Sequence, residues 1–195
     1  MGERQVFQPL TREDKITVVL YRVGIVLSAI IMAGLAYLLA TASLRTAAAN
    51  ILGYSLHASV GMSVFFIHLY IRKIKTYLVG LYFLSLGCLA ALILVGKGSL
   101  ADAFMQGSYG PLLLLSLSGC LAFVTAKEAF CFQLFEGYLL AMLMPFYLLL
   151  VAVGALSGTG ASSSLVLIAA LLVLFTLRKV FQPLAYDIGD KSAYH

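Results

Sequence analysis

The sequence predicts an all-α membrane protein, a bundle of six transmembrane helices with both termini in the cytoplasm. Three observations support this prediction. Hydrophobic residues make up 62% of the 195 residues and charged residues 11%, and the mean hydropathy is +1.02. Apolar runs recur at about the 20 residues that a helix needs to cross a bilayer. Basic residues flank these runs mainly on one side, which indicates a fixed orientation.

Six apolar runs, separated by Gly, Pro or charged residues, predict the transmembrane helices. Each run has to be helical because lipid offers the backbone no hydrogen-bond partners. The first run is too long for a cleaved signal peptide, so we expect it to remain as a helix. The shortest connection is a break at Lys127, between the fourth and fifth runs. The predicted spans are 18–42, 50–71, 76–96, 108–126, 129–156 and 163–181.

An even number of spans places both termini on the same side of the membrane. We therefore expect a cytoplasmic segment 1–17, a bundle 18–181 and a cytoplasmic tail 182–195. Eleven basic residues fall on the side of the termini, and only Arg45 and Lys97 fall on the other, which makes the first side cytoplasmic. The eleven are Arg4, Arg12, Lys15, Arg22, Arg72, Lys73, Lys75, Lys127, Arg178, Lys179 and Lys191.

The second span carries two of the three histidines, His57 and His68. Eleven residues of helix return to within about 20° of the starting direction, so both histidines are predicted on one face, about 16 Å apart. Gly53 and Gly61 share that face, and small residues allow another helix to approach closely. Packing and interhelical hydrogen bonds are the default role of such histidines. The alternative is ligation of a tetrapyrrole or a metal by His57, His68 or Cys131.

Acidic residues in the fifth span raise the main functional question. Glu128 is predicted at the cytoplasmic interface, with Cys131 one turn deeper and Glu136 about 12 Å deeper along the same helix. An ionised Glu136 facing lipid costs a few kcal/mol, so we expect it to face the bundle, pair with a base or be protonated. The residues predicted to gather in the cytoplasmic half are Arg22, His68, Arg72, Lys127, Glu128, Cys131, Glu136 and Arg178.

This polar cluster has two interpretations. It is a network of charges that pins helix ends together, or it is a proton- or ion-handling site in which Glu136 titrates and His68 relays protons. The tail motif with Asp187, Asp190 and Lys191 either folds back onto the basic helix ends or serves for docking. These alternatives stay open at the level of the sequence.

Composition also excludes several classes of protein. The net charge of +5 comes from basic residues scattered as helix flanks, which does not indicate a nucleic-acid partner. Three cysteines within apolar runs, without a CxxC pair, do not indicate disulfides or a structural zinc site. We find no nucleophile–base pair and no phosphate-binding loop, so neither a catalytic residue nor a required cofactor is predicted.

Several short motifs resemble those of an uncharacterised family of bacterial and cyanobacterial multi-pass integral membrane proteins, defined only as a domain of unknown function. The resemblance implies a multi-pass helical protein without an established activity. It also implies the inner (plasma) membrane of a bacterial cell, or a thylakoid membrane, and a role in the biogenesis of membrane complexes. The motifs are YR at 21–22, HLYIR at 68–72, KEAFCF at 127–132 with Glu136, RKVFQP at 178–183 and DIGDKS at 187–192.

Three functional hypotheses follow. The first is a structural or accessory factor that associates with other membrane proteins, or with a second copy of itself, within the lipid bilayer. The second is a small proton- or ion-coupled transporter or channel that uses Glu136 and His68. The third is a tetrapyrrole- or metal-binding membrane redox protein.

Overall fold

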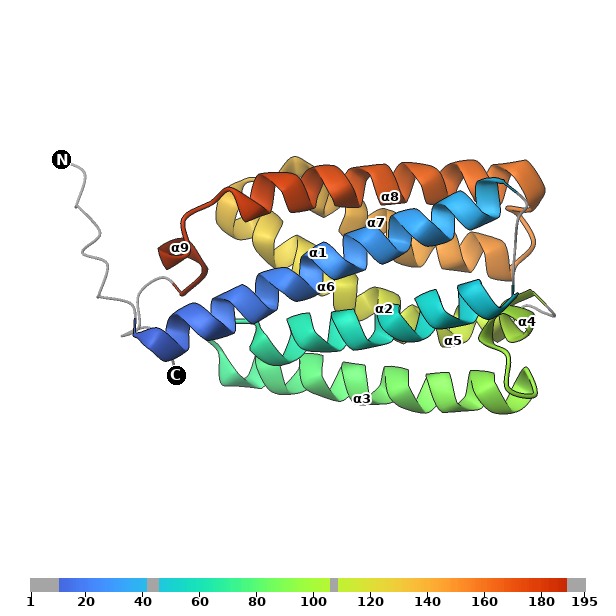
Figure 1. The fold of residues 1–195 in the computed structure, drawn as a ribbon, viewed down its shortest axis with the longest axis horizontal. Helices are drawn as coiled ribbons and strands as arrows, with labels where there is room; N and C mark the ends of the chain where they lie inside the picture. Colours follow the sequence, from blue (N-terminus) through green and yellow to red (C-terminus); the bar gives the residue numbers. More distant parts are fainter. Residues whose placement is uncertain (1–10, 42–45, 106–108, 189–195) are drawn as a thin grey trace.

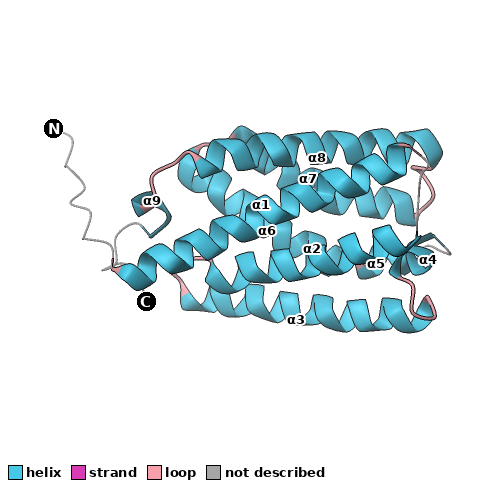
Figure 2. Ribbon diagram, in the orientation of Figure 1, coloured by secondary structure: helices cyan, strands magenta, loops and turns pink. Residues whose placement is uncertain are grey.

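The structure, a computed structural model, describes residues 11–41, 46–105 and 109–188. The all-α prediction is confirmed, because these residues form helices and no strand (Figure 2). The helices are α1 (Arg12–Ala40), α2 (Thr46–Phe66), α3 (Arg72–Val95), α4 (Leu100–Met105), α5 (Tyr109–Leu113), α6 (Leu115–Phe132), α7 (Phe135–Ala152), α8 (Gly158–Val180) and α9 (Ala185–Ile188).

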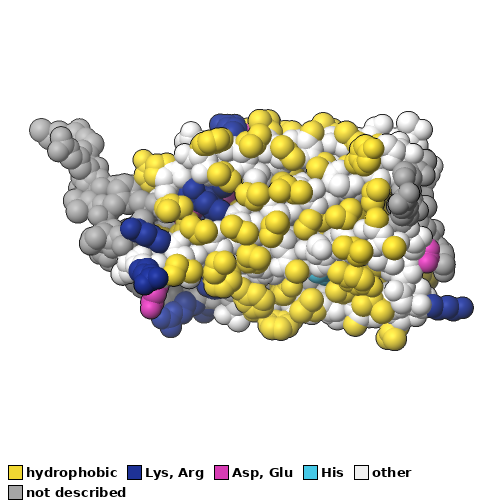
Figure 3. All heavy atoms as spheres, viewed as in Figure 1, with side chains coloured by type: hydrophobic (Ala, Val, Ile, Leu, Met, Phe, Trp, Pro, Cys, Tyr) yellow, Lys and Arg dark blue, Asp and Glu magenta, His cyan; other side chains and the backbone are white. Residues whose placement is uncertain are grey.

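The long helices run side by side along one axis of the bundle (Figure 1). Helix α1 begins and α8 ends at the same end, where α9 also lies; we call this the charged end. The short helix α4 lies at the opposite end. Apolar side chains cover the middle of the face shown in Figure 3, and basic side chains concentrate toward the charged end.

Five helices of the described part are long and apolar enough to cross a membrane: α1, α3, α6, α7 and α8. Helix α2 has 21 residues but does not reach the same apolar composition, since it contains Asn50, His57 and several serines. It is well buried between its neighbours, so its polar groups face protein. The sixth span and the cytoplasmic side of the termini therefore stay predictions.

Local sequence explains where α1 begins. Thr11 accepts a hydrogen bond from the Asp14 amide at 3.2 Å, and the Asp14 carboxylate accepts one from the Thr11 amide at 2.8 Å. This reciprocal capping box satisfies two amides that otherwise lack partners at a helix start. Consequently α1 begins six residues before the predicted span 18–42, and its first turns extend beyond the apolar run.

The predicted break at Lys127 is wrong. Helix α6 continues through Lys127 to Phe132, and the chain turns at Gln133, whose φ of 54° is left-handed. Lysine is a good helix former, and here its ammonium pairs with Glu128, so the charge does not end the helix. Glu128 therefore lies in the last turns of α6 and Glu136 in the first turn of α7, not along one helix as predicted.

Helices α1 and α2 approach each other closely at small residues. A Cβ on Gly24 would lie 2.4 Å from Ser63 Oγ and 2.8 Å from the Ser59 carbonyl oxygen, so only glycine fits this crossing. The Ser28 and Ser59 hydroxyls are 2.9 Å apart across the same contact. The two glycines that the sequence analysis singled out face other helices: a Cβ on Gly53 would meet Leu100 of α4, and one on Gly61 would meet the Tyr82 hydroxyl of α3.

Candidate functional site

The candidate site is a cluster of five charged side chains that we call the buried charge network: Arg22, Lys127, Glu128, Lys179 and Asp187. They come from α1, α6, α8 and α9, which converge at the charged end. Lys179 and Glu128 are fully buried, and Asp187 and Arg22 are nearly so. Three cations face two carboxylates, so each carboxylate has more than one basic partner.

Glu128 lies at the centre of this network. Its Oε1 accepts hydrogen bonds from the Tyr21 hydroxyl at 2.6 Å and from Lys127 Nζ at 2.7 Å. Its Oε2 is in ion-pair contact with Lys179 Nζ, although that contact lacks hydrogen-bond geometry. Such multiple pairing is what an ionised carboxylate needs to be retained away from water.

Lys179 links Glu128 to the C-terminal segment. Its Nζ forms ion pairs with both Glu128 and Asp187, and it lies 3.8 Å from the centre of the Phe132 ring. An ammonium over an aromatic face is attracted by the negative face of the ring. Lys179 therefore joins α8 to α6 and α9 at a single point.

Arg22 closes the other side of the network. Its Nε lies 2.7 Å from Asp187 Oδ2, and its Nη1 and Nη2 donate to the carbonyls of Val180, Gln182 and Pro183 at 3.1, 2.6 and 3.1 Å. These carbonyls lie at and just after the end of α8, where unpaired carbonyls and the helix dipole favour a cation. One side chain of α1 thereby holds the chain between α8 and α9.

A second, separate ion pair joins α7 to α8. Arg178 Nη1 lies 2.8 Å from both carboxylate oxygens of Glu136. The Arg178 side chain is 52% exposed, whereas that of Glu136 is 7% exposed. Of the alternatives predicted for Glu136, the structure has the side chain buried and paired with a base. Among the described residues, this pair forms no ion pair or hydrogen bond with the buried charge network.

His68 lies outside the helices, in the connection between α2 and α3, because α2 ends at Phe66. The prediction that His57 and His68 share one helical face is therefore wrong. The Thr17 hydroxyl lies 3.3 Å from His68 Nε2, and it also contacts the backbone carbonyls of Glu13 and Asp14. Burial, together with the charges of Lys75 and Lys127, lowers the pKa of His68.

The other predicted cluster residues are not part of these contacts. Cys131 is exposed near the end of α6, and Arg72 is exposed at the start of α3, with no ion pair among the described residues. No group of three metal-ligating side chains is present in the described part of the chain. Of the tail motif, Asp187 folds back onto the basic helix ends, whereas Asp190 and Lys191 lie outside the described residues.

Lys179 and Tyr21 are the site residues that the sequence analysis did not select. A signal for Lys179 exists, because Leu172 and Phe175 are fully buried on α8 and Lys179 continues the same stripe. Arg178 falls beside that stripe and is half exposed. The helical position, and not the charge, distinguishes the two adjacent bases.

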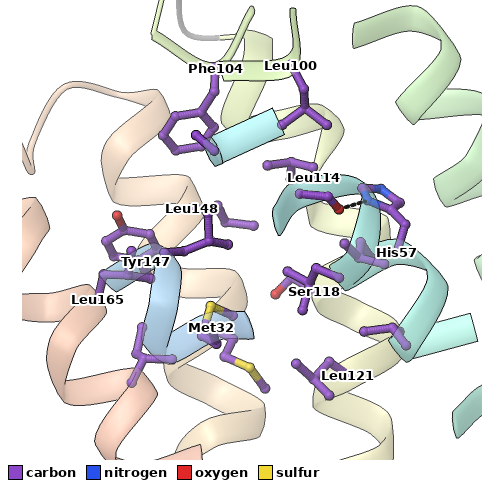
Figure 4. A pocket seen from close by; sticks show the side chains of 18 of the residues that line it. Met32, His57, Leu100, Phe104, Leu114, Ser118, Leu121, Tyr147, Leu148 and Leu165 are labelled. Carbon is purple, nitrogen blue, oxygen red and sulfur yellow. Dashed lines mark hydrogen bonds between the residues drawn. The ribbon is translucent and has the colours of Figure 1, made fainter. Parts of the chain in front are cut away.

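His57 lies away from the charged end. It lines an apolar cavity of about 180 Å³ between α1, α2, α4, α6, α7 and α8 (Figure 4). Its Nδ1 lies 3.0 Å from the Gly53 carbonyl oxygen, which can only accept, so Nδ1 carries the proton.

The helical bundle with its apolar surface and its charged end defines a multi-pass integral membrane protein. Residues 62–195 match the family described as uncharacterized integral membrane protein (DUF2301), and the chain belongs to this family. The matched region contains Lys127, Glu128, Lys179 and Asp187, whereas Arg22 precedes it. The prediction of an uncharacterised integral membrane protein family is thereby confirmed, whereas the bacterial origin and the motifs stay predictions. Comparisons with curated proteins and with solved structures found no match.

Proposed function

We propose that the protein is a structural or accessory factor that associates with another membrane complex at its charged end. The observation that carries this proposal is that Glu128, Glu136 and Asp187 are each paired with cations of the same chain. Glu128 and Asp187 are each held by two bases, and both oxygens of Glu136 accept from Arg178. Carboxylates paired in this way are poorly suited to exchange protons or bind a substrate cation. These side chains instead hold the helix ends in one arrangement.

The surface around the network supplies contact area for a partner. Phe130, Phe135 and Phe181 are 80%, 69% and 85% exposed, next to the turn between α6 and α7 and at the end of α8. Aromatic side chains at the end of a bundle reach the membrane interface, where another membrane protein can contact them.

Site-specific crosslinking tests this proposal. A photo-crosslinking phenylalanine analogue is introduced at Phe135, and a matched control carries it at Tyr109, which is 79% exposed near the opposite end. We expect a discrete crosslinked protein in native membranes from position 135 and none from position 109. Crosslinks to lipid alone at both positions, together with purification of the protein without companions in mild detergent, contradict the proposal.

A transporter function using Glu136 and His68 receives less support. Four helices each place one fully buried apolar side chain between the cavity and the buried charge network. These are Val64 of α2, Val124 of α6, Leu140 of α7 and Leu172 of α8. Charged or protonated species cross such a layer only at high cost. The buried hydroxyls beside this layer, Ser63 and Thr125, donate to backbone carbonyls of their own helices, which gives a proton path little support.

Tetrapyrrole binding is also less favoured. A cavity of about 180 Å³ is little larger than the 150 Å³ cavity that accommodates benzene in a well-studied protein, and a macrocycle needs several times that space. His68 and Cys131 lie at the charged end, far along the bundle from His57. An absorbance spectrum of the purified protein without a Soret band is the expected result.

A further inference from the structure

The cavity beside His57 has the properties of a ligand site rather than of a packing defect. Its lining is apolar except for three side chains, His57, Ser118 and Tyr147, among the described residues. Leu100 and Phe104 of α4 lie over one end of it (Figure 4). An apolar pocket with a few convergent polar groups is the usual form of a small-molecule site.

Ser118 is the unusual member of this lining. Its hydroxyl oxygen is buried and has no hydrogen-bond partner among the described residues. Serine and threonine inside a helix normally bond a carbonyl of the preceding turn, and Ser28, Ser63, Ser85 and Thr125 all do so here. In Figure 4 the Ser118 oxygen points toward the middle of the ring of lining side chains.

His57 adds a hydrogen-bond acceptor to the same cavity. Because Nδ1 donates to the Gly53 carbonyl, the neutral ring leaves Nε2 with a lone pair. Nε2 has no protein partner in the part of the chain that the structure describes. Leaving the buried Ser118 hydroxyl unpaired is unfavourable, and a bound molecule with a matching polar group offsets that cost.

We propose that the cavity binds a small uncharged ring compound that carries a hydroxyl group, a phenol in the simplest case. The volume fits one substituted benzene ring, and the lining excludes charge because no ionised side chain compensates it. The hydroxyl proton is donated to His57 Nε2, and Ser118 donates to the hydroxyl oxygen. The ring packs against the apolar side chains of α1, α7 and α8.

Three fluorinated probes of similar size test this assignment by ¹⁹F NMR on the purified protein in lipid nanodiscs. The first, 4-fluorophenol, carries a hydroxyl group. Fluorobenzene has no oxygen, and 4-fluoroanisole has a methoxy oxygen that can accept but not donate a hydrogen bond. After correction for partition into protein-free nanodiscs, we expect 4-fluorophenol to bind about fivefold more tightly than the other two. Equal binding of the three probes overturns the assignment of a hydroxyl-bearing ligand.

Two variants locate the site. Ser118→Ala removes one oxygen and keeps the space, so fluorobenzene binding is retained and the preference for 4-fluorophenol falls toward one. Ser118→Leu fills the cavity, and both probes are expected to lose binding by more than about tenfold. Thermal unfolding without probe checks that each variant is folded. The proposal is overturned if a folded Ser118→Leu variant binds 4-fluorophenol as tightly as the wild-type protein does. If the leucine variant does not fold, the result with Ser118→Ala decides.

Discussion

Arg22 Nη2 lies 2.7 Å from Asp187 Oδ2, although 165 residues separate the two in the chain. The pair closes the bundle, since it joins the first long helix to the last described one. It also explains why an acidic tail motif follows an apolar helix: Asp187 supplies the negative charge that the buried bases of α1 and α8 require. Asp187, the first residue of that motif, is thus an internal part of the fold.

Loss of the Asp187 charge should destabilise the protein. Asp187→Asn leaves Arg22 and Lys179 with less compensation, and removing one member of a buried pair typically costs about 3–5 kcal/mol. Asp102→Asn, in α4 at the opposite end, is the control and should change the free energy of unfolding little. Circular dichroism during a titration with SDS in mixed micelles measures both variants. Equal effects of the two substitutions contradict the role given to Asp187.

The adjacent bases Arg178 and Lys179 should differ strongly. Lys179→Met leaves Glu128 and Asp187 short of a cation in a fully buried position, with an expected loss of about 3–5 kcal/mol. Arg178→Met removes a half-exposed base and leaves one buried carboxylate, Glu136, without its partner, so the expected loss is smaller, about 1–3 kcal/mol. Combining Lys179→Met with Glu128→Gln should recover part of the loss, because an unpaired carboxylate is removed. The same unfolding titration tests this, and simple additivity would argue against direct coupling.

Close packing of α1 against α2 predicts a large effect of one methyl group. Gly24→Ala brings Cβ against the Ser63 backbone and side chain, and overpacking of this kind costs about 1–3 kcal/mol. Gly80→Ala, in α3, meets nothing within 4 Å and should be neutral or stabilising, because alanine favours a helix. Unfolding midpoints of the two variants check this directly. A Gly24→Ala protein as stable as wild type would mean that the helices separate at no cost.

Stability should depend on pH through His68. Its pKa is lowered in the folded state, so the unfolded chain binds the proton more readily. The contribution is therefore fully present above the unfolded pKa of about 6.5 and is lost as the pH falls through that value toward the folded pKa. Wild type should lose more stability between about pH 7.5 and pH 5 than His68→Gln does. Identical pH profiles of the two proteins would rule out His68 as the source.

Cysteine labelling should determine the orientation. Cys131 is exposed near the charged end and Cys120 is fully buried, so a membrane-impermeant maleimide should modify the first and spare the second. In a Cys88→Ser background, inside-out vesicles should label Cys131 and intact cells should not. A Cys131→Ser, Lys97→Cys variant should give the reverse pattern. Labelling of Cys131 from outside would overturn the cytoplasmic assignment of the charged end.

Some of the site could be predicted from the sequence and some could not. For Glu136 the sequence left three alternatives, facing the bundle, pairing with a base or protonation, and in the structure Arg178 is the paired base. The pairing of Glu128 was not predictable in this way, since it depends on Lys127 continuing α6 and on Lys179 facing inward. The one-face arrangement of His57 and His68 failed because α2 ends two residues before His68. Helix ends are decided by caps and packing as much as by hydropathy.

The sequence by itself determined that the chain is a helical membrane protein, because apolar runs in lipid can satisfy their backbone only as helices. It also determined that the ionisable groups collect toward one end. Only the tertiary structure decided which carboxylate meets which base, and that Ser118 and His57 face a common cavity. Such contacts join helices that are far apart in the chain, and they depend on the rotation of each helix about its axis, which hydropathy does not specify.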